Sequence, residues 1–339
     1  DLASALCRNE DGSLNPGNPP LITEISAMGY STRVQLVAEA WDVNAYQLGR
    51  AFPGATWRQW NGQYRDDVRS FMRGDPGRVG ALMTRLYGSD DLFPDTLQDA
   101  QRPYQSVNFV SSHDGLCLYD LTAYNWKHNE ANGQDNHDGT DNNLSWNCGW
   151  EGDAGASRQV LALRRRQVKN FFALLMLSNG TPMFCAGDEF MNTQAGNNNP
   201  YNQDNPTTWL NWHLLRRNRS VYRFCKRMIA FRKAHPSIGR SRYWRDDVRW
   251  YGKDGPVDLS YQSRALAYCL HGVSEGDDDL YVMINSHWED AHFVVQEGNA
   301  GDWRRVVDTG RPCPEDIACP GSEQPLNSLQ VGVAARSVV

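Results

Sequence analysis

The sequence has little of what several common classes of protein require. Its longest apolar run, from Phe171 to Leu177, is far shorter than the roughly 20 residues that cross a membrane. It has no basic surplus either, because 34 lysines and arginines stand against 40 aspartates and glutamates, which gives a net charge of −6. Nucleic-acid binding depends on an excess of positive charge. We therefore expect no membrane partner and no nucleic-acid partner.

Cysteine motifs that bind zinc are also absent. Eight cysteines occur, and no two of them form a CxxC pair. A disulfide framework is not expected in a chain with this much core-forming sequence, although Cys313 and Cys319 could bridge a loop. Most of the thiols are therefore expected to be buried.

The chain opens at Asp1 without an initiator Met and without a charged-then-apolar leader. We expect an internal start, with an upstream part of the protein outside this numbering. Its 339 residues suffice for one large domain and a small one. Charged residues make up 22% and hydrophobic residues 40%, which is ordinary for a globular protein.

Aromatic residues are plentiful, with 12 Trp and 14 Tyr, and Asn and Asp cluster in the segments between apolar runs. Aromatic rings stack on the apolar faces of sugars, and short polar side chains bind sugar hydroxyls. This composition suits carbohydrate recognition, although most of the rings are expected to pack in the core.

Three apolar segments each end in polar or acidic residues. They are Val34–Ala38 before Glu39, Ser106–Ser111 before His113-Asp114, and Thr181–Ala186 before Gly187-Asp188-Glu189. Continuous apolar runs are typical of parallel strands that are covered on both faces. Carboxyl ends of parallel strands carry the active sites of α/β barrels. Glu39, which is followed by Trp41 and Asp42, is therefore a candidate catalytic residue, or else a carboxylate that caps a strand.

Helical patterns separate these strands. Helices are predicted at Gln63–Arg73, Gly77–Tyr87, Ser157–Leu177 and Leu214–Lys233. Alternation of strand and helix indicates parallel βαβ units. After about residue 240 the pattern changes to short strands separated by turns, as in an antiparallel β-sandwich: 248–251, 265–270, 280–284, 292–295 and 303–307.

Seven segments together resemble isoamylase-type debranching enzymes of the α-amylase superfamily. These segments are Asp1–Arg8, Ala38–Asp42, Trp60–Asp67, Asn108–Gly115, His128–Gly133, Asp141–Gly149 and Gly196–Asn205. The resemblance implies the C-terminal half of a (β/α)8 TIM barrel over residues 1–238, followed by a β-sandwich domain over 239–339. Family residues that precede the nucleophile lie outside this numbering.

The resemblance also implies roles for particular residues. Asp1 matches the nucleophile, Glu39 the general acid/base and Asp114 the third carboxylate, with His113 beside it. A retaining glycosidase needs two carboxyl groups about 5–5.5 Å apart, one as nucleophile and one as acid and then base. Without the resemblance, Asp1 would be interpreted as a helix N-cap, and His113-Asp114 as a turn-stabilising pair.

Further residues are candidates for binding sugar. Trp41, Trp60 and Tyr64 could stack on sugar rings, and Asp42 could bind hydroxyls. No metal or cofactor is expected. Calcium stays an alternative, because Asp135, Asp138 and Asp141 follow one another at three-residue spacing, although the spacing is not that of an EF-hand.

The resemblance implies hydrolysis of α-1,6-glucosidic branch points in glycogen, amylopectin or limit dextrins. The partner would be a branched α-glucan, the compartment cytoplasm or plastid, and an oligomer is possible. One alternative is a non-catalytic glucan-binding subunit of a debranching complex. Another is a sister enzyme, such as a trehalose-forming hydrolase or a branching enzyme, although the segment from His128 to Gly149 does not suit a branching enzyme.

Overall fold

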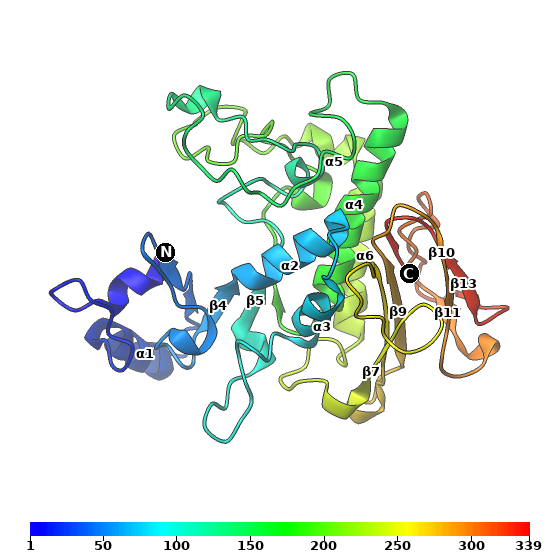
Figure 1. Ribbon diagram of the computed structural model, residues 1–339, viewed down its shortest axis with the longest axis horizontal. Helices are drawn as coiled ribbons and strands as arrows, with labels where there is room; N and C mark the ends of the chain where they lie inside the picture. The colour runs from blue at the N-terminus through cyan, green and yellow to red at the C-terminus, as the bar shows by residue number, and fades with distance from the viewer.

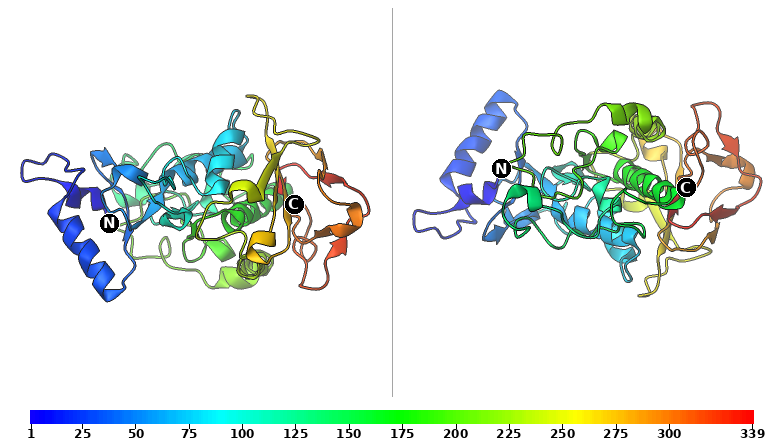
Figure 2. Two further views of the ribbon diagram at one scale, coloured as in Figure 1. Left: turned by 90° about the horizontal axis from the view of Figure 1, so that it is seen from below. Right: turned by 90° about the horizontal axis from the view of Figure 1, so that it is seen from above.

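A computed structural model describes residues 1–339 and shows a mixed α/β protein, as predicted. The N-terminal segments lie at one end of the molecule, and the antiparallel strands of the C-terminal part lie at the other (Figures 1 and 2). The long helices α4 and α6 run side by side between them (Figure 1). No helix has the length and apolar character needed to cross a membrane.

Four parallel strands form the N-terminal sheet. They are β1 Val37–Ala38, β4 Arg58–Asn61, β5 Ser106–Asn108 and β6 Thr181–Pro182, and they pair in that order. Between β1 and β4, the strands β2 Trp41–Asp42 and β3 Ala45–Tyr46 form a small hairpin. Because the four strands are parallel, the residues that follow each of them reach the same edge of the sheet.

The helices begin and end as the local sequence dictates. Ser157 caps α4 by accepting a hydrogen bond from the Val160 N–H at 3.2 Å. Asn61 caps α2 in the same way, and Gly74 ends it in the left-handed conformation at φ 91°. The α-helices are α1 Pro20–Thr32, α2 Gly62–Arg73, α3 Val79–Tyr87, α4 Arg158–Leu177, α5 His213–Arg217 and α6 Arg219–Ala234.

The C-terminal part is antiparallel. One sheet has the order β14-β9-β8-β7, and two strand pairs, β10–β13 and β11–β12, lie beside it. These strands are β7 Val248–Tyr251, β8 Ala265–Leu270, β9 Leu280–Asn285, β10 Ala291–Val294, β11 Arg304–Arg305, β12 Gln324–Pro325, β13 Gln330–Val333 and β14 Ser337–Val338.

Strand β8 is buried along its whole length because it has a different partner on each face. Leu266, Tyr268 and Leu270 belong to the main hydrophobic cluster with α4 and α6. Ala265 and Ala267 belong to a second cluster with residues of β10 and β13. The main cluster extends from α2 to β14 and crosses residue 238, whereas the predicted domain boundary there stays a prediction.

Most predicted elements are confirmed, with shifts at their ends. The predicted strands at 248–251 and 265–270 match β7 and β8, whereas the strands predicted before Glu39, His113 and Asp188 are shorter than expected. The helix predicted at 214–233 is interrupted at Asn218, whose side-chain N–H donates to the Phe190 carbonyl at 2.9 Å. Helix α1 and strand β4 were not predicted.

Tyr64 lies in the core, so the prediction that it binds sugar is wrong. Its side chain on α2 is fully buried in the main cluster. Its hydroxyl shares a 2.8 Å hydrogen bond with Ser178 Oγ at the end of α4, and burial raises its pKa. The spacing of α2 explains this, because Tyr64, Val68 and Phe71 follow one another at helical intervals on the buried face.

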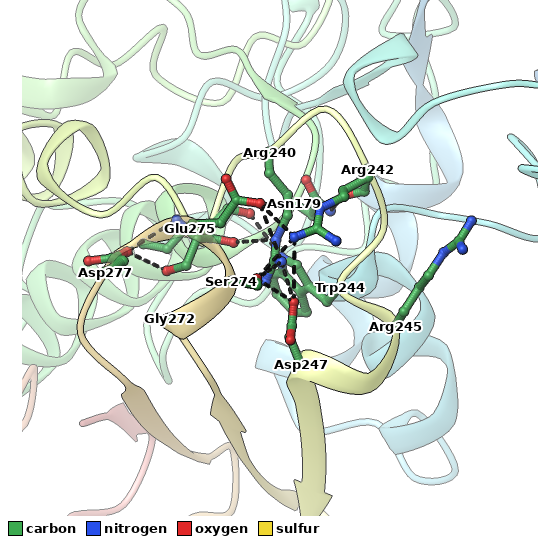
Figure 3. Close-up of polar contacts among 12 residues, drawn as sticks. Asn179, Arg240, Arg242, Trp244, Arg245, Asp247, Gly272, Ser274, Glu275 and Asp277 are labelled. Carbon is green, nitrogen blue, oxygen red and sulfur yellow. Dashed lines mark hydrogen bonds and ion pairs between the residues drawn. The ribbon is translucent and has the colours of Figure 1, made fainter.

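A buried arginine joins the segment after α6 to the turn before β9 (Figure 3). Arg240 Nη1 donates to Asp247 Oδ2 at 2.5 Å and to Ser274 Oγ at 3.0 Å, and its Nε donates to the Ser237 carbonyl at 3.1 Å. The half-exposed Arg242 binds Glu275 Oε1 at 2.9 Å (Figure 3). This charged cluster lies at the side of the main core where α6 meets the C-terminal sheet.

Replacing Arg240 with Met should lower the free energy of unfolding by about 1–3 kcal/mol. The reason is that Asp247 and the Ser237 carbonyl lose a buried donor, although Asp247 keeps the Ser274 hydroxyl at 2.7 Å and is partly solvated. Urea denaturation of the variant measures this. Arg242→Met is the matched control and should cost less than about 1 kcal/mol, because the Arg242 side chain is half exposed. Equal losses of unfolding free energy in the two variants would show that the buried hydrogen bonds of Arg240 stabilise the fold no more than the exposed ion pair of Arg242.

Replacing Tyr64 with Phe should lower the free energy of unfolding by about 1 kcal/mol, since one buried hydrogen bond is lost. The same variant should keep the wild-type affinity for α-glucans, because the ring is enclosed. Thermal denaturation and glucan-affinity electrophoresis check the two statements. A clear loss of glucan affinity in a folded variant would restore the original prediction for Tyr64.

Candidate active site

Glu39 is a buried carboxylate at the carboxyl end of β1. Its Oε2 accepts a 3.1 Å hydrogen bond from the Leu2 N–H, and its backbone carbonyl accepts one of 2.9 Å from the Ala3 N–H. Its Oε1 is buried and has no hydrogen-bond partner in the protein. Buried polar atoms are seldom left unpaired, so this oxygen is positioned for a ligand or a reaction.

His113 and Asp114 follow β5 and lie next to Glu39. His113 Nε2 is 3.7 Å from Glu39 Oε1 and 3.7 Å from Asp114 Oδ1. Polar atoms of the three residues all lie within 4.8 Å of one another, a spacing that could also hold a metal ion. The side chains of His113 and Asp114 are 61% and 71% exposed, so the cluster opens to solvent.

Asp1 is held near Glu39 by the two residues that follow it, Leu2 and Ala3. Leu2 has a left-handed backbone at φ 44°, which is unusual for a residue other than glycine. The two hydrogen bonds from Leu2 and Ala3 to Glu39 hold this turn against the end of β1. The structure thus brings Glu39, His113 and Asp114 together at one edge of the parallel sheet. Asp1 lies next to them through the backbone of Leu2, but its carboxyl group is not part of this cluster.

Trp60 closes one side of this group. It lies in β4, between β1 and β5, and its half-buried ring packs edge-on against His113 at 5.6 Å and 66°. It also packs against Phe109 at 5.7 Å. Trp60 is therefore beside the predicted catalytic residues, where it supports the His113 ring.

Trp41 and Asp42 lie in the hairpin that follows Glu39. Trp41 stacks on Tyr46 at 5.9 Å with an angle of 16°. Asp42 is bound by Arg8, which donates from Nε at 2.9 Å and from Nη2 at 3.0 Å. Hydrogen bonds from the Asn44 N–H and from Arg8 lower the pKa of Asp42, although burial opposes them. Asp42 is thus an ionised partner of Arg8 that anchors the hairpin.

A cleft of about 440 Å³ lies along this hairpin, and its walls contain Trp41, Tyr46 and Arg65. Gly62 forms part of the cleft, and a Cβ there would come within 2.6 Å of the Tyr46 hydroxyl, so a larger residue would displace the Tyr46 side chain. The sequence analysis did not identify Tyr46 and Arg65 as candidates for binding sugar. The Val43-Asn44 turn between two short strands is the signal that would have paired Tyr46 with Trp41.

Asp188 holds the loop that carries His113 and Asp114. Its Oδ1 accepts from the Leu118 N–H at 3.0 Å, and its Oδ2 accepts from Ser111 Oγ at 2.6 Å and the Cys185 N–H at 3.0 Å. Burial raises the pKa of Asp188 to about 6. Asp188 therefore ties the ends of β5 and β6 together.

The Asn-rich segment 126–152 packs against 192–203 through side-chain amides. Asn129 Nδ2 donates to Asn198 Oδ1 at 2.8 Å, and Asn132 Nδ2 donates to Asp138 Oδ2 at 2.7 Å. The hydrogen bond from Asn132 lowers the pKa of Asp138, whereas Asp141 pairs with Lys127 at 2.8 Å. Asp135, Asp138 and Asp141 form no joint cluster of metal ligands, and the calcium alternative stays untested.

Known proteins resemble this chain over most of its length. Residues 249–337 match the family model "Isoamylase 1-3, C-terminal". The chain is 42% identical to "Isoamylase 3, chloroplastic" of Oryza sativa subsp. japonica, covering 95% of this chain and 40% of that protein. It is 40% identical to "Glycogen operon protein GlgX homolog" of Mycobacterium tuberculosis, covering 83% of this chain and 42% of that protein.

Solved structures show the same fold at low sequence identity. The pullulanase from Bacillus acidopullulyticus superimposes with a TM-score of 0.69 at 16% identity, covering 94% of this chain and 35% of that chain. The chain spans about two fifths of the length of the curated relatives named above. The chain thus resembles isoamylase-type debranching enzymes over most of its own length.

Proposed function

We propose that the complete protein hydrolyses α-1,6-glucosidic branch linkages in glycogen, amylopectin or limit dextrins. The observation that carries this proposal is the buried, unpaired Oε1 of Glu39, which lies 3.7 Å from His113 and beside the turn that bears Asp1. An enclosed carboxyl group with one oxygen free of hydrogen bonds suits an acid that has to give up and regain a proton. The names of the relatives describe isoamylases and a glycogen debranching enzyme.

The proposed architecture is the C-terminal half of a (β/α)8 barrel over residues 1–238, followed by a β-sandwich over 239–339. Four parallel strands in sequential order support the first part, with α2 and α3 between β4 and β5, and α4 between β5 and β6. Sheets that enclose a common hydrophobic cluster support the second. The outer edges of β1 and β6 are unpaired, so the remainder of a longer chain would have to supply the strands that close the barrel.

The proposed reaction proceeds with retention of configuration. Asp1 attacks the anomeric carbon of the branch while Glu39 protonates the glycosidic oxygen, so the main chain leaves with a free 6-hydroxyl and the branch stays bound to Asp1. Glu39 then removes a proton from water, which releases the sugar from Asp1. Asp114 and His113 hold hydroxyls of the reacting sugar, with contacts that strengthen as the ring flattens.

The hairpin cleft is proposed to receive further glucose units. Trp41 offers the face of an aromatic ring, Tyr46 stacks beside it, and Arg65 can donate to hydroxyls. The absence of a cofactor stays a prediction, with calcium as the alternative, and so does a possible oligomer. The compartment is proposed to be plastid or cytoplasm, in line with the word "chloroplastic" in the plant relatives' names.

Replacing Glu39 with Gln should lower kcat for reducing-end release from amylopectin by about 10²–10⁴-fold, because the acid/base group is lost. The measurement uses the full-length protein, and Glu24→Gln on the exposed face of α1 is the matched control. The control should keep full activity. Release that survives in Glu39→Gln would refute the role of Glu39. Glucan binding without release in the wild-type protein would favour the non-catalytic subunit.

Replacing Trp41 with Ala should raise KM for branched glucans roughly three- to tenfold and leave kcat within about twofold, because a stacking surface of about 0.5–1.5 kcal/mol is lost. Trp288→Ala, at an exposed tryptophan in the C-terminal part, should leave both constants unchanged. An unchanged KM in Trp41→Ala would show that the hairpin cleft does not bind substrate.

A further inference from the structure

A second group of metal-ligating side chains lies in the C-terminal part, away from the proposed active site. Cys269 is in β8, His271 follows it two residues later on the same face, and Asp279 comes directly before β9. One potential ligand atom from each residue lies within 4.8 Å of those of the other two. Thiol, imidazole and carboxylate are the donor types found in zinc sites.

Two carboxylates, Asp279 and Glu297, lie beside His271, and each accepts a hydrogen bond from another residue. Asp279 Oδ1 accepts a 2.8 Å hydrogen bond from the Gly272 N–H, and its Oδ2 faces His271 Nδ1 at 3.1 Å. Glu297 Oε1 accepts a 2.6 Å hydrogen bond from the Tyr251 hydroxyl, and its Oε2 lies 3.3 Å from His271 Nε2. Histidines that bind metal usually donate their second ring N–H to a carboxylate, as Glu297 is placed to accept here.

The donors are imperfectly satisfied without an ion. His271 Nε2 is buried and makes no hydrogen bond of good geometry, although Glu297 lies close to it. Two carboxylates, Asp279 and Glu297, face one imidazole, and apart from His271 the cation that pairs with Glu297 is Arg249, at 3.9 Å. Burial, together with Glu297 and Asp279, raises the pKa of the Cys269 thiol. A dication would offset this local negative charge.

We propose that Cys269 Sγ, His271 Nδ1 and Asp279 Oδ2 bind a zinc-type divalent cation, with water in the fourth position and Glu297 orienting His271. Ligand atoms on one tetrahedral zinc ion are about 3.3–3.7 Å apart, and the three groups lie within 4.8 Å of one another, so small side-chain movements would complete the site. On binding, the ring proton between His271 Nδ1 and Asp279 Oδ2 moves to Nε2, which faces Glu297, and the thiol proton of Cys269 goes to solvent. The ion would link the two ends of the turn between β8 and β9, and Glu297, in the segment after β10, would contact it only through His271.

The competing interpretation is a hydrogen-bonded Asp279–His271–Glu297 bridge with Cys269 as a buried thiol. Only the metal site contains a bond between the Cys269 sulfur and a metal ion, so detecting that bond distinguishes it from the hydrogen-bonded bridge. Cobalt(II) can replace zinc in such sites, and a thiolate ligand gives it an intense near-ultraviolet charge-transfer band. A bridge without metal gives no such band.

The test uses the full-length protein after removal of metals with a chelator. Titration with Co²⁺ should produce the charge-transfer band with a stoichiometry of one, and Zn²⁺ should abolish it by displacing the cobalt. Cys269→Ala should eliminate the band, and His271→Gln should weaken Co²⁺ binding at least tenfold. Tyr251→Phe should weaken it about tenfold while keeping the band, because only the support of Glu297 is lost.

Matched controls separate this site from other thiols and from the proposed active site. Cys225→Ala removes another buried thiol, and the pair Cys313→Ser and Cys319→Ser removes the two exposed ones. Glu39→Gln removes one member of the other possible metal-binding group. All three proteins should keep the band and the affinity. Absence of the band in the wild-type protein, or its persistence in Cys269→Ala, would overturn the proposal.

Discussion

The site depends on the parallel pairing of β1, β4 and β5. Because Ala38 is level with Gln59, and Asn61 with Asn108, the segments that follow these strands meet at one edge of the sheet. Parallel order alone would not suffice, because the loops after short strands are free to diverge. The hydrogen bonds from Leu2 to Glu39 and from Leu118 to Asp188 fix two of those loops, so backbone donors position the carboxylates.

Stability and chemistry conflict at Glu39. A buried polar atom without a partner costs about 1–3 kcal/mol, and the same atom is the one that faces His113. The left-handed backbone at Leu2 adds local strain on the other side of the carboxylate. The structure tolerates both because the surrounding cluster of Ala3, Ala38 and other apolar residues is well packed. Destabilised atoms gathered at one place are typical of functional sites.

Sequence reasoning predicted the elements whose pattern is local. The α4 helix, with its Ser157 cap, and the alternation around β7 and β8 are encoded within a few residues. Strand β4 was missed because Arg58 and Gln59 are polar, and Gln59 becomes buried only through its bonds to the Gly49 backbone. Tyr64 was assigned to the surface for a similar reason, since its partner Ser178 is 114 residues away. The resemblance to a family supplied the roles of Asp1 and Asp114, which no local pattern contains.

Strand β8 determines how the two halves of the chain can behave. One face packs on α4 and α6 and the other on β10 and β13, so removing the C-terminal strands would strip the helices of their apolar cover. The C-terminal part is therefore not a detachable module that could be exchanged between relatives or lost by proteolysis. Heat or denaturant should unfold both halves in one cooperative transition. A substitution that disrupts packing on one face of β8 should also destabilise the elements that pack on its other face.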